Sequence, residues 1–174
     1  FWNFVEFVVG DDGLNIRSLY TGFSIDIFEH ENEEAKDEPE HYTIKFEKQP
    51  SIFDKECADC IAQYANDDGT PTKKWEKVTT KLSELNTSKL HYVRVPENHI
   101  VIDFDIKDKD GNKSFEKNLE AASKWPATYA ELSKSGAGIH LHYIYTGDVS
   151  KLSRIYAEDI EVKAFTGNSS LRRK

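Results

Sequence analysis

Two aspartates, Asp103 and Asp105, stand one residue apart in HIVIDFDI, the most apolar stretch of the chain. Alternate side chains of a β-strand point to the same side, so both carboxylates are expected on one face, with Cα atoms roughly 7 Å apart. Like charges this close repel, and at least one carboxylate would take up a proton unless a cation lay between them. A divalent cation such as Mg²⁺, which binds one or two carboxylates together with water and substrate phosphates, suits this pair.

Two other interpretations of the aspartates were weighed. A DxD motif taken alone also fits a pair of surface aspartates on a one-sided sheet, and that alternative stays open. The neighbouring DKDG resembles part of a calcium-binding EF-hand loop, which would need an acid at position 106 and a glutamate at position 117. The chain has Ile106 and Lys117 there, so the calcium loop is excluded.

Two later stretches repeat the alternation of apolar and polar residues. In GIHLHYIY, His140 and His142 share the face opposite an apolar one, and in DIEVKAF, Glu161 and Lys163 do the same. If these strands lie in one sheet with a common core side, acids, imidazoles and an ammonium gather on the other side. The three strands together therefore predict a site on that face, with His142 as a neighbour or packing residue.

The loop SKSGAG leads into the strand of His140. Gly136 and Gly138 allow a positive φ and close backbone approach to a ligand, and Ser135 adds a hydroxyl. Successive amides in such a turn form a concavity for anions. Taken alone the motif is most often a simple turn, but beside the acids and the histidine it suggests a triphosphate held next to a metal.

The remaining pattern predicts an α+β fold with mixed or antiparallel strand pairing. Residues 1–10 form a helix or a strand, and the acidic stretch 31–40 is a solvated loop. The predicted helices cover 53–65, 73–85 and 114–125, and the predicted strands cover 23–30, 41–48, 89–95, 99–106, 128–133, 138–147 and 159–165. A proline turn at PEN is expected to join 89–95 and 99–106 as a hairpin.

In order, IDFD, SGAGIH and IEVK resemble the motifs of the archaeo-eukaryotic primase superfamily, above all its phage and plasmid primase-polymerases. The resemblance covers about residues 90–170. It implies a palm-like (RRM-like) sheet with helices packed on one face. It also implies a two-part core, with an N-terminal α/β portion at 1–89 and a metal- and nucleotide-binding portion at 90–174. Since such cores usually continue further, we expect this chain to be a fragment of a longer one.

The same resemblance implies roles for individual residues. Asp103, Asp105 and Glu161 would hold two Mg²⁺ or Mn²⁺ ions, and His140 would contact the phosphates of the incoming nucleotide. The nucleotide-binding set also includes the loop residues Ser135, Gly136 and Gly138, and Lys163. The implied function is a DNA primase or DNA polymerase that makes or extends primers on a single-stranded DNA template from dNTP or NTP. A helicase domain or protein is an expected partner.

Two alternatives from other functional classes stay open. One is a catalytically inactive relative that binds nucleotide or DNA. The other is a metal-dependent nuclease that uses the same carboxylates.

Bulk properties exclude several classes of protein. The 174 residues carry a net charge of −8, which disfavours coating DNA by bulk charge. No apolar run approaches the roughly 20 residues of a membrane span, so no membrane partner is expected. Cys57 and Cys60 could be half of a zinc site, but no second pair follows, so a pair of helix-buried thiols in a reducing cytosol is expected. The resemblance to phage and plasmid enzymes implies the cytoplasm of a bacterial host. Arg94, Arg172 and Arg173 are expected to be surface cations.

Overall fold

The computed structural model describes residues 16–18, 25–26, 43–44, 50–125 and 128–173. They fall into two compact units, one within residues 1–46 and 100–163, the other within 47–99 and 164–174. The boundary expected at residue 90 falls inside the second unit. The segments 1–10 and 31–40 lie outside the described residues.

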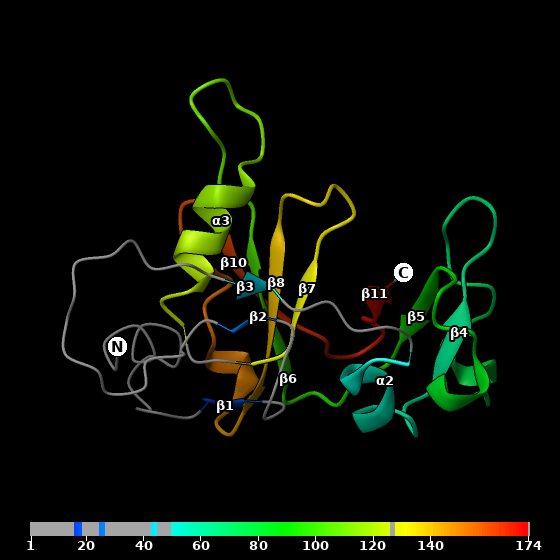
Figure 1. Cartoon of the computed structure of the whole chain (residues 1–174). Helices are drawn as coiled ribbons and strands as arrows, with labels where there is room; N and C mark the ends of the chain where they lie inside the picture. The colour runs from blue at the N-terminus through cyan, green and yellow to red at the C-terminus, as the bar shows by residue number, and fades with distance from the viewer. Residues whose placement is uncertain (1–15, 19–24, 27–42, 45–49, 126–127, 174) are drawn as a thin grey trace. The chain divides into compact units, whose positions relative to one another are not determined.

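The first unit is built on a six-stranded sheet with the order β1-β8-β6-β10-β9, in which β7 also pairs with β8 (Figure 1). Its strands are β1 (Ile16–Ser18), β6 (His99–Phe104), β7 (Ala130–Leu132), β8 (Ile139–Tyr145), β9 (Ile155–Ala157) and β10 (Ile160–Ala164). β7 and β1 pair antiparallel with successive stretches of β8, and β9 pairs antiparallel with β10. A separate two-stranded ladder pairs β2 (Ile25–Asp26) with β3 (Thr43–Ile44), within the predicted strands 23–30 and 41–48.

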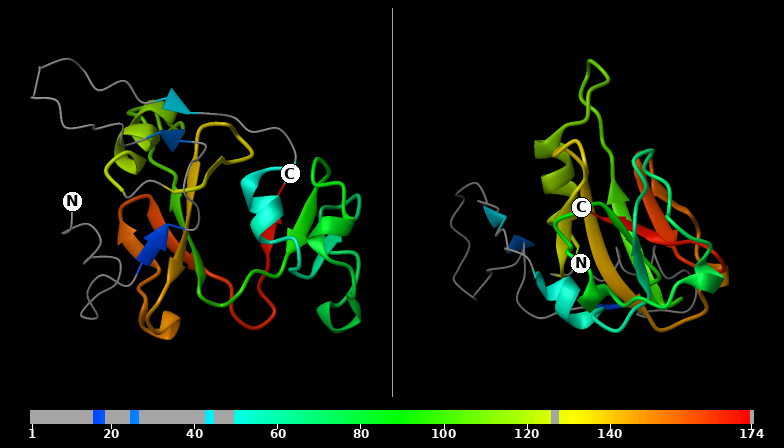
Figure 2. Two further views of the ribbon diagram at one scale, coloured as in Figure 1. Left: turned by 60° about the horizontal axis from the view of Figure 1, so that its bottom comes forward. Right: turned by 90° about the vertical axis from the view of Figure 1, so that its right-hand side faces the viewer.

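One face of the large sheet carries the hydrophobic core of this unit. The core takes alternate residues of the three central strands: Ile100, Ile102, Phe104, Ile139, Leu141, Tyr143, Tyr145, Ile160 and Val162. Helix α3 (Phe115–Ala122) packs on this face through Leu119 and Ala122, and Figure 2 shows it alongside the sheet. The predicted alternation of the three strands is confirmed, so their polar residues lie on the opposite face.

Helix α3 begins where its sequence directs. The Ser114 hydroxyl accepts a hydrogen bond from the Lys117 backbone N–H, which satisfies one of the free donors of the first turn. The helix ends at Ala122, with Ser123 as its C-cap, inside the predicted span 114–125. A short 3₁₀ turn, η4 (Val149–Lys151), follows later in the same unit.

The second unit has a three-stranded antiparallel sheet with the order β11-β5-β4. Its elements are α2 (Ile52–Glu56), β4 (Ala62–Tyr64), the 3₁₀ turns η2 (Trp75–Lys77) and η3 (Leu82–Glu84), β5 (His91–Val93) and β11 (Leu171–Arg173). Phe53, Leu82 and Val93 are fully buried in it. The chain is therefore α+β with antiparallel sheets and few helices, as the sequence predicts at this level.

Two predicted helices are wrong. The span 53–65 holds the five-residue helix α2 followed by strand β4, and 73–85 holds only two 3₁₀ turns. The backbones of the two spans form hydrogen bonds with each other and not within a helix. The Ala62 N–H donates to the Thr80 carbonyl at 3.0 Å, and the Leu82 N–H donates to the Cys60 carbonyl at 2.9 Å. These tertiary hydrogen bonds outweigh the helix propensities of the two spans, because propensity differences between residues are only about 0.5 kcal/mol each.

The predicted hairpin of 89–95 with 99–106 is also wrong. The turn itself exists, because the His99 N–H donates to the Pro96 carbonyl at 2.9 Å. The strands on either side of it belong to different sheets. β5 pairs with β4 and β11, whereas β6 lies between β8 and β10, so the edges of both strands are already occupied.

Among the described residues, no helix has both the length and the apolar character needed to cross a bilayer.

Candidate active site

Three adjacent strands bring a carboxylate, an imidazole and an ammonium together on the polar face of the large sheet. Asp103 lies on β6, His140 on β8 and Lys163 on β10. The His140 Nε2 is 3.1 Å from Asp103 Oδ1, and the Lys163 Nζ is 2.6 Å from Asp103 Oδ2. The Asp103 side chain is only 7% exposed, whereas the His140 and Lys163 side chains are 25% and 44% exposed.

Asp103 stays ionised in this setting. Burial by itself raises the pKa of the carboxyl group, but the contacts with His140 and Lys163 outweigh it and lower the pKa to about 2. The opposite charges favour the carboxylate form. A buried, permanently charged carboxylate is therefore fixed at the centre of this face.

Asp103 opens into a pocket of about 520 Å³. The pocket is lined by two aspartates, two lysines, two serines and one histidine: Asp103, Asp105, Lys113, Ser133, Lys134, Ser135 and His140. The sequence singled out four of these residues. It missed Lys113, Ser133 and Lys134.

The loop between β7 and β8 forms one wall of the pocket. The Ser133 N–H donates to the Gly138 carbonyl at 2.8 Å, and the Gly138 N–H donates to the Ser133 hydroxyl at 2.9 Å. A Cβ placed on Gly138 would lie 2.7 Å from Ser133 Oγ and 2.9 Å from Asp105 Oδ1. Gly138 thus lets the loop approach the Asp105 carboxylate, while Gly136 adopts φ +74°, which favours glycine.

Asn118 ties the aspartate strand to this loop. Its side chain is fully buried in α3. The Oδ1 atom accepts a hydrogen bond from the Ile106 N–H at 2.8 Å, and the Nδ2 donates to the Ala137 carbonyl at 2.8 Å. The sequence carried a signal for this residue that we did not use, because an asparagine on the apolar stripe of an amphipathic helix needs internal partners.

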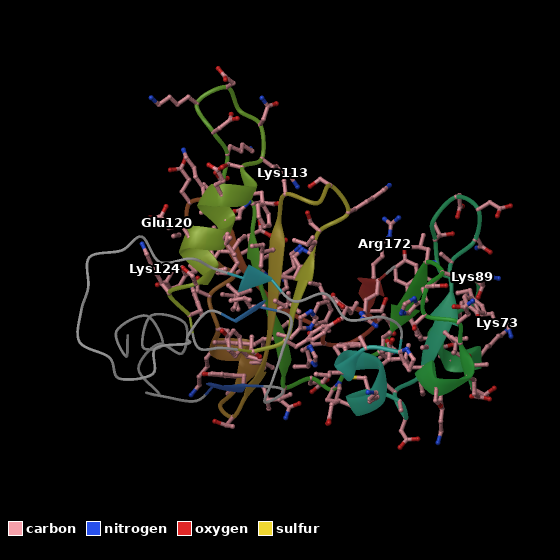
Figure 3. The ribbon with its side chains drawn as sticks, in the orientation of Figure 1. Lys73, Lys89, Lys113, Glu120, Lys124 and Arg172 are labelled. Atoms are coloured by element: carbon pink, nitrogen blue, oxygen red, sulfur yellow. The ribbon has the colours of Figure 1, made fainter. Side chains whose placement is uncertain are left out.

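A hairpin after β6 positions Lys113. The Ser114 N–H donates to the Ile106 carbonyl at 2.9 Å, and the backbones of Lys107 and Lys113 pair in an antiparallel β-bridge. Figure 3 shows Lys113 at the base of this hairpin, on the side of the β7–β8 loop. The Lys113 Nζ is 2.8 Å from Asp105 Oδ1, and this contact raises the pKa of the lysine. Nothing in the sequence spacing indicated the pair, since it depends on how the hairpin folds back.

Two carboxylate oxygens in the pocket lack hydrogen bonds. Among the described residues, neither of the buried atoms Asp103 Oδ1 and Asp105 Oδ1 accepts a hydrogen bond of good geometry, although His140 Nε2 lies 3.1 Å from the first and Lys113 Nζ 2.8 Å from the second. Buried acceptors normally find a donor or an ion. Mg²⁺ and Mn²⁺ are often held by one or two carboxylates and complete their shells with water and phosphate oxygens. The two aspartates fit such a cation.

Glu161 is not brought into the pocket. It is exposed on the same face of β10 as Lys163, but it does not line the cavity. Within the part of the chain that the structure describes, no group of three or more His, Cys, Asp or Glu side chains is arranged to hold a metal ion.

A second polar cluster extends the same face along β8. His142 is fully buried, and its Nε2 lies 3.2 Å from Glu131 Oε2. The Tyr129 hydroxyl donates to Glu131 Oε1 at 2.9 Å, and its ring packs against the imidazole at a centroid distance of 5.2 Å. Glu131, which the sequence reading did not single out, is the partner that allows this histidine to be buried.

Two expectations concern residues of the second unit. Cys57 and Cys60 are not joined by a disulfide, and contact with Cys57 lowers the pKa of Cys60. Of the two thiols expected to be buried in a helix, Cys57 is buried at the C-cap of α2, whereas Cys60 lies beyond the helix and is partly exposed. The expectation that Arg173 is a surface cation is wrong. Its guanidinium is buried, lies 2.7 Å from Asp54 Oδ1 and stacks over the Phe53 ring, because β11 places it on the core side of its sheet.

No family model, no curated protein and no solved structure matches this chain.

Proposed function

We propose that the chain is a metal-dependent nucleotidyltransferase of the primase-polymerase type. It makes or extends primers on a single-stranded DNA template from nucleoside triphosphates. One observation carries the proposal: Asp103 and Asp105 share a pocket with His140 and a glycine–serine loop, and one buried oxygen of each aspartate lacks a hydrogen bond. The order of the motifs IDFD and SGAGIH along the chain supports it.

The architecture of the first unit supports a palm-like sheet. Helix α3 covers the apolar face, and the acid, histidine and lysine side chains lie on the other. A palm domain uses one face of its sheet for the core and the other for chemistry. This arrangement favours the archaeo-eukaryotic primase core, with the template and primer on the polar side.

The charge of the pocket suits a triphosphate. Two aspartates and two lysines line it, so their formal charges sum to −2 + 2 = 0, with His140 left out of the sum. One divalent cation would raise this sum to +2, which favours a polyanion. When bound, Mg²⁺ or Mn²⁺ would neutralise the phosphates and activate the attacking hydroxyl.

The chain's own residues have distinct tasks in this proposal. Asp103 and Asp105 would hold the cation, whereas Glu161, the third carboxylate that the resemblance implies, lies outside the pocket lining. His140 binds the phosphates, and Ser135 with the amides around Gly136 and Gly138 cradles them. Lys163 keeps Asp103 ionised and fixes its orientation. Lys134 adds positive charge at the pocket rim.

The test is primer synthesis on single-stranded DNA without added primer, with dNTP and NTP supplied separately and Mg²⁺ or Mn²⁺ present. We expect product from the wild type and none above background from the Asp103→Asn/Asp105→Asn double variant. Asp110→Asn, an exposed aspartate in the adjacent hairpin, is the matched control and should retain full activity. Synthesis by a folded double variant would refute the proposal.

A second candidate is binding of nucleotide or DNA without catalysis. It is favoured by the ion pairs of both aspartates with lysines, which neutralise the carboxylates without a metal. This candidate predicts triphosphate binding that is unchanged by EDTA, with no product in the synthesis assay. Degradation of labelled DNA without nucleotide would instead indicate a nuclease.

The proposed setting follows from the function. Single-stranded DNA and dNTP or NTP are the substrates, and a helicase that unwinds the template is the proposed partner. We propose that the protein acts in the cytoplasm of a bacterial host in phage or plasmid replication. Copurification with the replicating plasmid or phage DNA would test this.

A further inference from the structure

The two lysines that contact the pocket aspartates are similarly exposed, but the carboxylates that they contact are not. Lys163 is 44% exposed and contacts Asp103, whose side chain is only 7% exposed. Lys113 contacts Asp105, and in that pair the two side chains are 41% and 40% exposed. The two ion pairs therefore differ in how strongly water screens them.

This difference separates their roles. An ion pair between exposed side chains gains little free energy, because water competes for both partners and the long side chain loses freedom when it is held. A pair with a buried carboxylate is costly to break, since the charge would remain without compensation. Lys163 is therefore fixed on Asp103, whereas Lys113 can leave Asp105 readily.

Asp105 itself has little room to move. Its Oδ1 atom packs against the β7–β8 loop at Gly138, and its backbone N–H donates to the Asp159 carbonyl at 2.8 Å. Lys113 stands on a hairpin whose base is fixed by hydrogen bonds, but its own side chain carries four rotatable methylenes. When the pair separates, the ammonium moves and the carboxylate stays.

We propose that Lys113 is an exchangeable counter-ion: it neutralises Asp105 when no metal is bound, and turns to the phosphates of a nucleoside triphosphate when a divalent cation takes the carboxylate. The inference rests on the proposed function and assigns a polyphosphate-binding role to a residue outside the DxD and SGAGIH motifs. The Lys113 ammonium stays within the same pocket whether it contacts Asp105 or the phosphates. Asp105 is therefore neutralised by the lysine or by the metal ion in each state.

The experiment measures Mn²⁺ binding without nucleotide, by the electron paramagnetic resonance signal of free Mn²⁺. The variants are Lys113→Met and, as the matched control, Lys109→Met, which removes the same charge from the exposed tip of the same hairpin. Loss of the competing ammonium should tighten Mn²⁺ binding about threefold in Lys113→Met, within the range of an exposed ion pair. Lys109→Met should leave the dissociation constant unchanged.

A second measurement follows the other half of the exchange. With Ca²⁺ as a cation in place of Mn²⁺, dATP should bind Lys113→Met about tenfold more weakly than wild type, because a charge-assisted contact with phosphate is lost. Tighter metal binding together with weaker nucleotide binding is a pattern that general loss of structure does not produce. Circular dichroism should show the same fold in all variants.

The outcomes separate this inference from the proposed function. If Lys113→Met and Lys109→Met bind Mn²⁺ equally while the wild type makes primers, the role of Lys113 is overturned and the function stands. If the Lys113→Met effects appear but no primers form, the exchange stands and the polymerase function fails. If the wild type binds no Mn²⁺, or if Asp105→Asn binds Mn²⁺ as tightly as the wild type, both the exchange and the polymerase function are overturned.

Discussion

Asn118 donates a hydrogen bond to the Ala137 carbonyl at 2.8 Å and accepts one from the Ile106 N–H at 2.8 Å. One buried amide thus joins the residue after Asp105 to the residue before Gly138. The two walls of the pocket are fixed relative to each other by a helix that lies on the opposite side of the sheet.

Replacing this amide should open the pocket. In Asn118→Leu the Ile106 N–H and the Ala137 carbonyl lose their partners, and each unsatisfied group costs about 1–3 kcal/mol. We expect the free energy of unfolding to fall by about 2–6 kcal/mol, measured by urea denaturation. Asn118→Asp keeps the acceptor for Ile106, so its loss should be smaller. Equal losses in both variants would show that the contact with the Ile106 N–H contributes nothing.

Gly138 should be intolerant of a side chain for a different reason from Gly136. The methyl group of Gly138→Ala would collide with Ser133 Oγ and Asp105 Oδ1 and displace the carboxylate. Gly136→Ala meets no atom within 4 Å but must adopt φ +74°, at a cost of about 1 kcal/mol in stability. We therefore expect Gly138→Ala to weaken Mn²⁺ binding more than Gly136→Ala does. The opposite order would contradict the close approach.

Acid should weaken the fold through Asp103. Its folded-state pKa of about 2 lies below the ordinary value of 3.8, so the ionised carboxylate stabilises the fold above about pH 4. This contribution, about 2 kcal/mol, is lost as the pH falls from 4 towards 2. Urea denaturation with a chelator present should show the stability gap between wild type and Asp103→Asn narrowing over that range. A gap that is constant from pH 7 to pH 2 would refute the assignment.

The second unit should depend on its buried ion pair. Arg173→Met would leave Asp54 charged and buried, although Thr87 still donates to it at 2.8 Å. Removing one partner of such a pair costs about 3–5 kcal/mol. Arg172→Met, at the exposed neighbouring position, should change the free energy of unfolding by less than about 0.5 kcal/mol. Similar losses in the two variants would mean that the pair does not stabilise this unit.

Strand periodicity identified the central part of the site. The alternation in 99–106 and 138–145 placed Asp103 and His140 on one face, and they lie 3.1 Å apart. This worked because a strand with one buried face fixes the direction of every side chain. Glu161 also lies on the polar face but does not line the pocket. Periodicity gives the face on which a side chain lies and not its distance from the pocket along the strand. The predicted helices 53–65 and 73–85 failed because hydrogen bonds between the two spans replace those within a helix.

The sequence by itself determined which strand residues face the core and which lie on the polar face, since two-residue alternation is a local property. Only the tertiary structure decided the partners. Lys113 forms an ion pair with Asp105, and Asn118 joins the two pocket walls by hydrogen bonds. Arg173 forms a buried ion pair with Asp54, which lies 119 residues earlier in the sequence. Such pairs depend on strand order and on how loops fold back, and no local pattern encodes those distances.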